Sequence, residues 1–306
     1  MDFTLKTYMH LLQTLRSHNY TFLPFSNYIQ LNKQTPSLPS SSEALAKEDH
    51  PLIILRHDVD KFPPNALQFA QIEHQLGIKG TYYFRIVPKS FDPDIIKKIA
   101  ALGHEIGYHY EDVDLAYKKL RAKSKEQRAK RNTQHLASRT QNLYDLAIES
   151  FLENLEVLRK IAPVKTICMH GSPLSKYDNK LLWKYYDYRD YEIIGEPYFD
   201  VDYSKVLYIT DTGRKWNNQS VSVRDKVDQK MEFGKNIKQP NNLQELYFFR
   251  NTNAIIKAIE NRTLPNTIMI NAHPHRWFDN YWGWTKELVM QNLKNIIKSL
   301  IVKYRN

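Results

Sequence analysis

The segment Leu52-Ile53-Ile54-Leu55-Arg56-His57-Asp58-Val59-Asp60 decides the fold. Its four leading apolar residues form a short continuous run, which is typical of a strand buried on both faces of a sheet. Pro63 and Pro64 suit the first turn of a helix, which we expect to continue to Leu76 and to stop at Gly77. A buried strand followed by a helix is the repeating unit of α/β proteins.

The same alternation continues along the chain. Further strands are predicted at 81–84, 105–108, 164–169, 191–194, 206–210 and 267–271. Further helices are predicted at 1–18, 92–102, 138–161, 243–260 and 285–302, with polar loops at 33–50 and 212–241. Neither an internal repeat nor a clean linker divides the chain. We therefore expect one α/β domain over 1–306, with an N-terminal helical extension at 1–50.

Length and composition exclude several classes of protein. The 306 residues are 42% apolar, enough to bury a sizeable core, so a wholly disordered chain is excluded. No apolar run reaches the roughly 18 residues of a membrane-spanning helix, and the N-terminus lacks the unbroken apolar stretch of a secretory signal. The one cysteine, Cys168, excludes a disulfide framework and a multi-cysteine zinc site. These features favour a cytoplasmic protein.

The formal net charge of +11 is concentrated in one segment. Residues 118–131 hold eight lysines or arginines and one glutamate, a net charge of +7. With few apolar residues, this run predicts a solvated helix within a polar insertion at 118–140. The alternative is an electrostatic guide for an anionic polymer or an anionic membrane. No aromatic residues interleave with the basic ones, so we expect no nucleic-acid partner.

Polar, chemically versatile side chains follow most of the predicted strands. The strand ends carry Asp58 and Asp60, Arg85, His109 and Glu111, His170, Asp211 and Arg214, and His273 and His275. This pattern is typical of a barrel with its active site at the carboxyl ends of the strands. An open sheet with a crevice at its strand ends would give the same pattern.

Asp58 and Asp60 are two residues apart, so in an extended segment both carboxylates point the same way. Two close carboxylates repel, and the pKa of one rises unless a cation lies between them. With a divalent metal, one carboxylate can be a ligand and the other a general base. The alternative is a structural loop whose acids cap the following helix or pair with Arg56 and Lys61.

His109 also follows a strand. With Asp60 and His170 it would form a mixed nitrogen and oxygen site with an open position, which suits catalytic zinc. Glu111 and His275 are alternatives to His170 as the third ligand.

Three further histidines have different expected roles. His104 begins its strand at the end opposite to His109, so we expect it to be structural. His273 and His275 flank Pro274, and one of them is a candidate general acid near the metal. The alternative is a loop packed by Trp277.

The ordered motifs of the chain resemble the polysaccharide deacetylase-like superfamily (NodB homology, carbohydrate esterase family 4), in the branch found with O-antigen and capsule biosynthesis. The motifs are Leu-Arg-His-Asp-Val-Asp (55–60), Gly-Thr-Tyr-Tyr-Phe (80–84), Gly-His-Glu-Ile-Gly-Tyr-His (103–109), Thr-Asp-Thr-Gly-Arg-Lys-Trp (210–216) and His-Pro-His-Arg-Trp (273–277). The resemblance covers residues 52–277. It implies a distorted (β/α)7 barrel and a divalent metal, usually zinc, held by one aspartate and two histidines.

The resemblance also implies roles for single residues. Asp58 matches the catalytic base, and Asp60 stands in for the metal-binding aspartate, shifted by one residue from the usual adjacent pair. His109 matches the first metal-binding histidine, and His273 matches the general acid. Arg214, in its Gly-Arg-x-Trp setting, is a candidate for substrate binding.

One position departs from the family pattern. The family has a second metal-binding histidine four residues after the first, where this chain has Val113. We therefore expect His170 to complete the metal site.

The resemblance predicts a hydrolase that removes an N-acyl group, most often N-acetyl, from an amino sugar on a small molecule or glycan. Additional candidates for substrate contact are Asp211, Trp216, His275 and Trp277. The second interpretation, favoured by Val113, is a non-catalytic barrel that binds carbohydrate or assists assembly. Metal analysis distinguishes the two.

Overall fold

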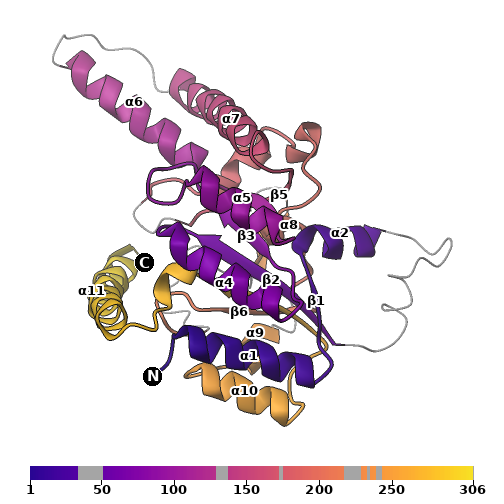
Figure 1. Ribbon diagram of the computed structural model, residues 1–306. Helices are drawn as coiled ribbons and strands as arrows, with labels where there is room; N and C mark the ends of the chain where they lie inside the picture. Colours follow the sequence, from indigo (N-terminus) through magenta and orange to yellow (C-terminus); the bar gives the residue numbers. More distant parts are fainter. Residues whose placement is uncertain are drawn as a thin grey trace.

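A parallel seven-stranded sheet surrounded by helices organises the computed structural model (Figure 1). The structure describes residues 1–33, 51–128, 137–171, 175–216, 229–232, 235–238 and 243–305. The strand order is β5-β4-β3-β2-β9-β6, and β1 pairs with the start of β2. The strands are β1 (Thr21–Leu23), β2 (Leu52–Val59), β3 (Thr81–Phe84), β4 (Glu105–Tyr110), β5 (Val164–Met169), β6 (Leu207–Thr210) and β9 (Thr267–Ala272).

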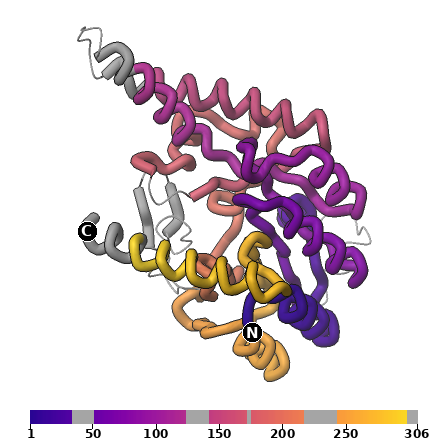
Figure 2. The backbone as a smooth tube through the Cα atoms, turned by 60° about the vertical axis from the view of Figure 1, so that its left-hand side comes forward, coloured from indigo at the N-terminus to yellow at the C-terminus, as the bar shows by residue number. Residues whose placement is uncertain are grey.

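Helices cover the sheet and extend beyond it. The longer ones are α1 (Leu5–Ser17), α2 (Phe25–Lys33), α4 (Pro63–Gln75), α5 (Pro93–Ala101), α6 (Asp112–Arg128), α7 (Ala137–Arg159), α10 (Thr252–Glu260) and α11 (Tyr281–Arg305). Helices α4 and α5 lie side by side, α1 packs against α10, and the α6–α7 pair projects past the sheet (Figures 1 and 2). None of the described helices is both long and apolar enough to cross a bilayer.

Local sequence signals explain where several elements begin. The Asp92 side chain accepts hydrogen bonds from the backbone N–H groups of Asp94 and Ile95, which caps α5, and Pro93 occupies its first turn. Successive residues of β2 point to opposite faces of the sheet. His57 therefore lies against α4, where its Nε2 is 2.8 Å from Glu73 Oε1, whereas Asp58 lies on the other face.

Most predicted elements are confirmed, and some are wrong. The strands at 81–84 and 164–169 match β3 and β5, but 191–194 is not a strand, because Asp187 caps a 3-10 helix at Tyr188–Tyr191. The helix predicted at 243–260 is two helices, α9 (Leu243–Leu246) and α10, because Asn251 caps a new start. The N-terminal extension is not wholly helical, since β1 joins the sheet.

The polar segments are described only in part. The basic run begins as expected in a solvated helix, since Lys118, Lys119, Arg121 and Lys123 of α6 are exposed. Residues 129–136 of the predicted insertion lie outside the described residues, as do residues 34–50 of the predicted loop. Within the predicted loop at 212–241, residues 212–216 form turns, and β7 (Gln229–Glu232) and β8 (Lys235–Lys238) form an antiparallel pair. Residues 217–228, 233–234 and 239–241 lie outside the described residues.

Candidate metal centre

Three predicted ligands meet at the carboxyl ends of the strands. Parallel strands end at one edge of a sheet, and the register pairs His109 of β4 with Cys168 of β5. Asp60 follows β2 and His170 follows β5, so both reach the same point as His109. Ligand atoms of Asp60, His109 and His170 all lie within 4.8 Å of one another.

The spacing of these atoms suits a divalent cation. Asp60 Oδ1 lies 3.4 Å from His109 Nε2 and 3.6 Å from His170 Nε2. This oxygen is buried and has no hydrogen-bond partner among the described residues. Ligand atoms about 2.0–2.1 Å from a tetrahedral zinc ion would be about 3.3–3.4 Å apart. The three side chains therefore fit such an ion.

Each histidine is held through its other ring nitrogen. His109 Nδ1 lies 2.9 Å from the Cys168 carbonyl oxygen, and His170 Nδ1 lies 3.2 Å from Glu111 Oε2. The contact with the Cys168 carbonyl places a proton on His109 Nδ1 and leaves its Nε2 to face Asp60, as second contacts do in metal sites. The Nε2 of His170 faces Asp60 as well. Glu111 is itself clamped by Arg85, whose Nη2 lies 2.6 Å from Oε1. Burial raises the pKa of Glu111, but His170 and Arg85 outweigh it and lower that pKa to about 2.

These contacts separate the three alternatives for the third ligand. His170 forms a group of close ligand atoms with Asp60 and His109, whereas neither Glu111 nor His275 belongs to such a group among the described residues, and Glu111 instead lies beside His170. Val113, at the position where the family has a histidine, is fully buried in the apolar core. The His170 ring instead lies beside His109, with ring centroids 5.1 Å apart. The residue beside His109 is therefore His170, which follows β5, and not the residue four positions after His109.

Asp58 occupies a more enclosed position than Asp60. It accepts hydrogen bonds from Arg56 Nε at 2.9 Å, from Arg56 Nη2 at 2.7 Å and from Asn271 Nδ2 at 3.0 Å. Burial raises its pKa, but Arg56 and His109 together hold the pKa of Asp58 well below its usual range. The carboxylate is therefore ionised at neutral pH. The predicted pairing with Arg56 is confirmed, whereas Lys61 pairs with Glu287.

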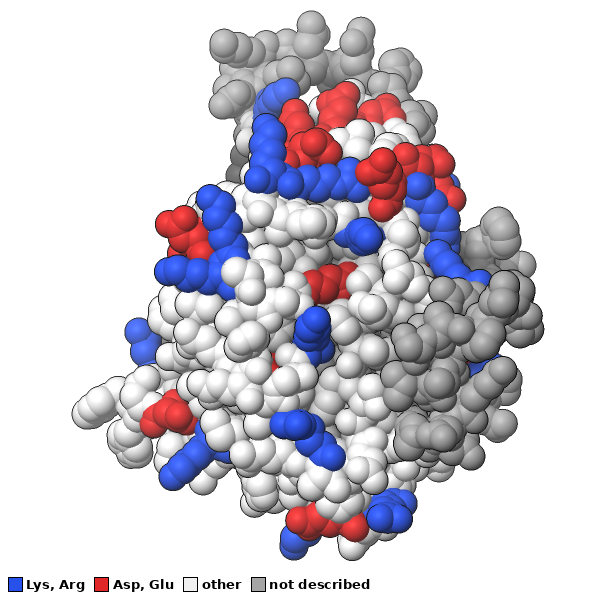
Figure 3. Space-filling model, turned by 45° about the vertical axis from the view of Figure 1, so that its right-hand side comes forward, with Lys and Arg blue, Asp and Glu red and all other residues white. Residues whose placement is uncertain are grey.

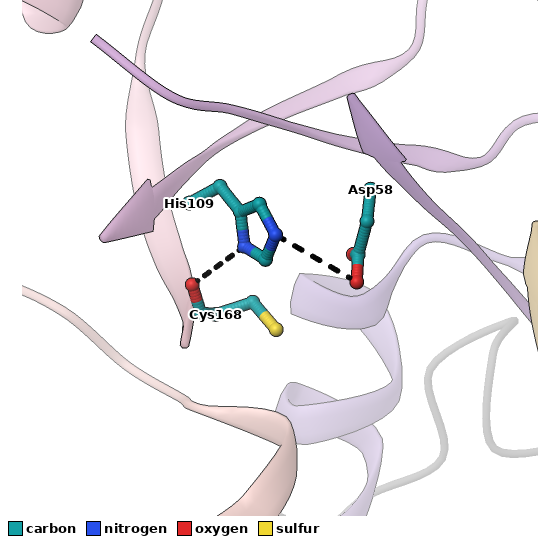
Figure 4. A group of neighbouring side chains, drawn as sticks. All are labelled: Asp58, His109 and Cys168. Atoms are coloured by element: carbon teal, nitrogen blue, oxygen red, sulfur yellow. Dashed lines mark hydrogen bonds and ion pairs between the residues drawn. The ribbon is translucent and has the colours of Figure 1, made fainter. Parts of the chain in front are cut away.

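A second group of donors shares His109 (Figure 4). Asp58, His109 and Cys168 also bring their ligand atoms within 4.8 Å of one another. Both oxygens of Asp58 accept other hydrogen bonds, however, and the Cys168 side chain is fully buried. Asp60 is 22% exposed and His170 is 16% exposed, which gives an ion a path from solvent. The Asp60 group is the better candidate.

The Nε2 edge of the His273 ring faces the candidate metal centre. Its Nδ1 lies 2.5 Å from Asp211 Oδ1, and its Nε2 lies 4.0 Å from Asp60 Oδ2. Asp211 also accepts from Arg276 Nη1 at 2.9 Å and from Trp277 Nε1 at 2.8 Å. Burial raises the pKa of Asp211, but Arg276 and His273 outweigh it and lower that pKa. The fully buried Asp211 therefore orients His273, rather than contacting substrate as predicted.

The other predicted substrate contacts are largely internal. Trp216 and Trp277 are 1% and 0% exposed and pack around Phe3, so neither ring faces solvent. Arg214 lies in the left-handed region, with a φ of 60°, and its Nη1 donates to the Trp284 carbonyl at 2.8 Å. His275 is buried, and burial together with Arg276 lowers its pKa well below the usual value. Its imidazole is therefore neutral.

Some predictions about single residues are confirmed, and some supporting residues were missed. His104 is structural. It lies 3.3 Å from Glu73, its Nδ1 accepts a hydrogen bond from the Gly80 N–H, and its Nε2 donates one to the Ala70 carbonyl. The supporting roles of Arg85 and Asn271 are not predicted, although Asn271 lies on β9 and Arg85 directly follows β3. Neither a scan against protein-family models nor a search of curated proteins finds a match for this chain.

Proposed function

We propose that the protein is a metal-dependent hydrolase that removes an N-acyl group, in the simplest case N-acetyl, from an amino sugar. One observation carries the proposal: Asp60, His109 and His170 lie together beside an arginine-held carboxylate, Asp58. Two imidazoles and one carboxylate form a donor set typical of catalytic zinc. The reaction class comes from the resemblance of the motifs to polysaccharide deacetylases, which is an analogy.

The side chains around the candidate metal centre have different roles in the proposed amide hydrolysis. A divalent cation bound by Asp60, His109 and His170 would supply Lewis acidity for the acyl carbonyl and the attacking water. Asp58 accepts a proton from that water as its oxygen bonds to the carbonyl carbon. His273 Nε2 gives a proton to the amine as the carbon–nitrogen bond breaks. Asp211 holds the His273 ring in the orientation for this transfer. The products are a free carboxylic acid and a free amino sugar.

We also propose that the sheet closes as a distorted seven-stranded barrel. β5 and β6 are the outer strands of the hydrogen-bonded order. Gly195, in the segment between them, pairs with Thr166 of β5. This contact supports an arrangement in which the segment covers the gap between the two outer strands.

Metal analysis and one carboxylate substitution test the proposal. We expect purified protein to bind zinc, cobalt or nickel and to release acetate from N-acetylated amino-sugar oligomers. Asp58→Asn should keep the metal and lose about 10²-fold or more in turnover. Asp94→Asn, which changes an exposed carboxylate on α5, is the matched control and should change neither.

A second pair of variants tests the ligands. His170→Ala should weaken metal binding about tenfold or more, whereas His10→Ala, which removes an exposed imidazole of α1, should not. The proposed hydrolase activity would be contradicted if the purified protein holds no divalent metal, and if added ions neither bind to it nor give activity. That result would favour the non-catalytic carbohydrate-binding protein instead.

A further inference from the structure

Helix α11 packs a stripe of polar side chains against the rest of the protein. Glu287, Gln291 and Asn295 recur every four residues and are only 8%, 5% and 8% exposed. Asn295 Nδ2 donates to the Gly213 carbonyl at 2.8 Å, and Glu287 lies 3.3 Å from Lys61 Nζ. A surface helix normally buries its apolar stripe and exposes its polar one. In α11 this arrangement is reversed.

The opposite side of α11 is apolar and exposed. Figure 2 shows the helix running along the outside of the molecule. We call this side the outer face of α11; its apolar residues are Tyr281, Trp282, Val289, Met290, Leu293, Ile296 and Ile297, which are 63%, 81%, 60%, 44%, 53%, 59% and 50% exposed. Trp282, Val289, Leu293 and Ile297 are spaced by seven, four and four residues, so they form one stripe. A contiguous exposed apolar stripe marks an interaction surface.

Charge identifies the kind of partner. Within Tyr281–Ile297, where side chains are described, the exposed charged residues are Lys286 and Lys294, while the acidic Glu287 points inwards. A second copy docked symmetrically would bring these lysines towards their own equivalents. An anionic lipid surface complements them. Tryptophan and tyrosine at the start of the helix suit the boundary between headgroups and acyl chains.

We propose that the outer face of α11 lies in the headgroup region of an anionic lipid bilayer, with the helix parallel to the membrane plane. This proposal goes beyond the hydrolase and does not depend on it. Polar contacts join α11 to Lys61, which directly follows Asp60, and to Gly213, which lies two residues after Asp211. Docking through α11 therefore brings two loops of the candidate metal centre close to the bilayer.

Vesicle binding tests this proposal. The probes are vesicles of phosphatidylcholine alone and of phosphatidylcholine mixed with phosphatidylglycerol, and the readout is co-sedimentation of the full chain. We expect binding to the mixed vesicles that weakens with added salt. Val289→Gln with Leu293→Gln should weaken it about tenfold or more, because each side chain loses apolar burial. Leu246→Gln with Phe248→Gln, at sites 77% and 68% exposed elsewhere, is the matched control and should leave binding unchanged.

Charge variants and the oligomeric state complete the test. Lys286→Gln with Lys294→Gln should weaken binding to the anionic vesicles several-fold and reduce its salt dependence. Circular dichroism checks that each variant is folded. Absence of binding to the mixed vesicles, or equal losses in the α11 and control variants, would overturn the proposal. A lipid-free dimer that Val289→Gln with Leu293→Gln converts to monomer would overturn it too, because the outer face would then be a subunit interface.

Discussion

At the scale of single residues, the orientation of His109 and of His273 is set by one ring nitrogen, and the other nitrogen faces the candidate metal centre. His109 Nδ1 is tied to the Cys168 carbonyl, and His273 Nδ1 is tied to Asp211. In both rings Nε2 is then directed at Asp60, at 3.4 Å and 4.0 Å. Burial lowers the pKa of His109, but Asp58 and Asp60 outweigh it and raise that pKa, whereas Asp211 fixes the orientation of the His273 ring. In the proposed hydrolase, the same kind of ring would serve as a metal ligand at one position and as a general acid at the other.

Asp211→Asn tests the second of these roles. The substitution keeps the shape of the side chain but removes the charge beside His273. We expect kcat/KM to fall about 10²-fold or more, with metal affinity nearly unchanged. The loss should appear in kcat rather than in KM, because the proposed acid acts when the carbon–nitrogen bond breaks and not in substrate binding. A loss confined to KM would contradict this role and indicate one in substrate binding.

At the scale of elements, one carboxyl group joins β4, α6 and α7. Asp112 accepts hydrogen bonds from the hydroxyls of Tyr108 at 2.7 Å and Ser150 at 2.8 Å, and from Asn154 Nδ2 at 2.8 Å. Burial outweighs these three hydrogen bonds and raises the pKa of Asp112 to about 6. The folded protein therefore favours the protonated carboxyl. Asp112 links stability to pH at the base of the α6–α7 pair.

Asp112→Asn should reveal this linkage. The stabilisation by the protonated carboxyl is complete below its ordinary pKa of 3.8 and is lost as the pH rises through about 6. From about pH 4 to about pH 7, wild type should therefore lose on the order of 2–3 kcal/mol of unfolding free energy relative to the variant. Urea unfolding across this range measures the difference. A gap that does not change with pH would contradict the raised pKa.

The sequence predicts elements well where local signals agree. The apolar runs at 81–84 and 164–169 match their strands, and the order of the parallel strands explains why Asp60, His109 and His170 could be predicted as neighbours. The strand expected at 191–194 is wrong because Glu192 adopts a left-handed φ of 61°, which ends a 3-10 turn. The role of Asp211 could not be predicted, because Arg276 and Trp277 reach it from a distant part of the chain.

At the scale of the whole molecule, the positive charge is unevenly spread. Lys118, Lys119, Arg121 and Lys123 are exposed on α6, which projects past the sheet (Figure 1). On the face drawn in Figure 3, by contrast, basic and acidic side chains are interspersed and much of the surface is uncharged. These exposed cations of α6 lie apart from the outer face of α11 (Figure 1), so the two surfaces can act on a membrane in different ways.

Replacing these four α6 cations by glutamine separates the two contributions. Long-range attraction acts mainly on the encounter, so we expect a several-fold slower association with phosphatidylglycerol-containing vesicles at low salt. Dissociation should be nearly unchanged, whereas Val289→Gln with Leu293→Gln on α11 should accelerate it. Stopped-flow mixing measures both rates. An association defect that persists at high salt would contradict a long-range role for α6.

The single cysteine gives this molecule a built-in chemical reporter. Cys168 is fully buried, and its own carbonyl holds the His109 ring. A thiol reagent in solution can reach the sulfur only when β5 separates from its surroundings. The rate of labelling therefore records how often the neighbourhood of His109 opens, without any engineered probe. Ions, lipids and sugars can be compared on one scale, by how far each slows that reaction.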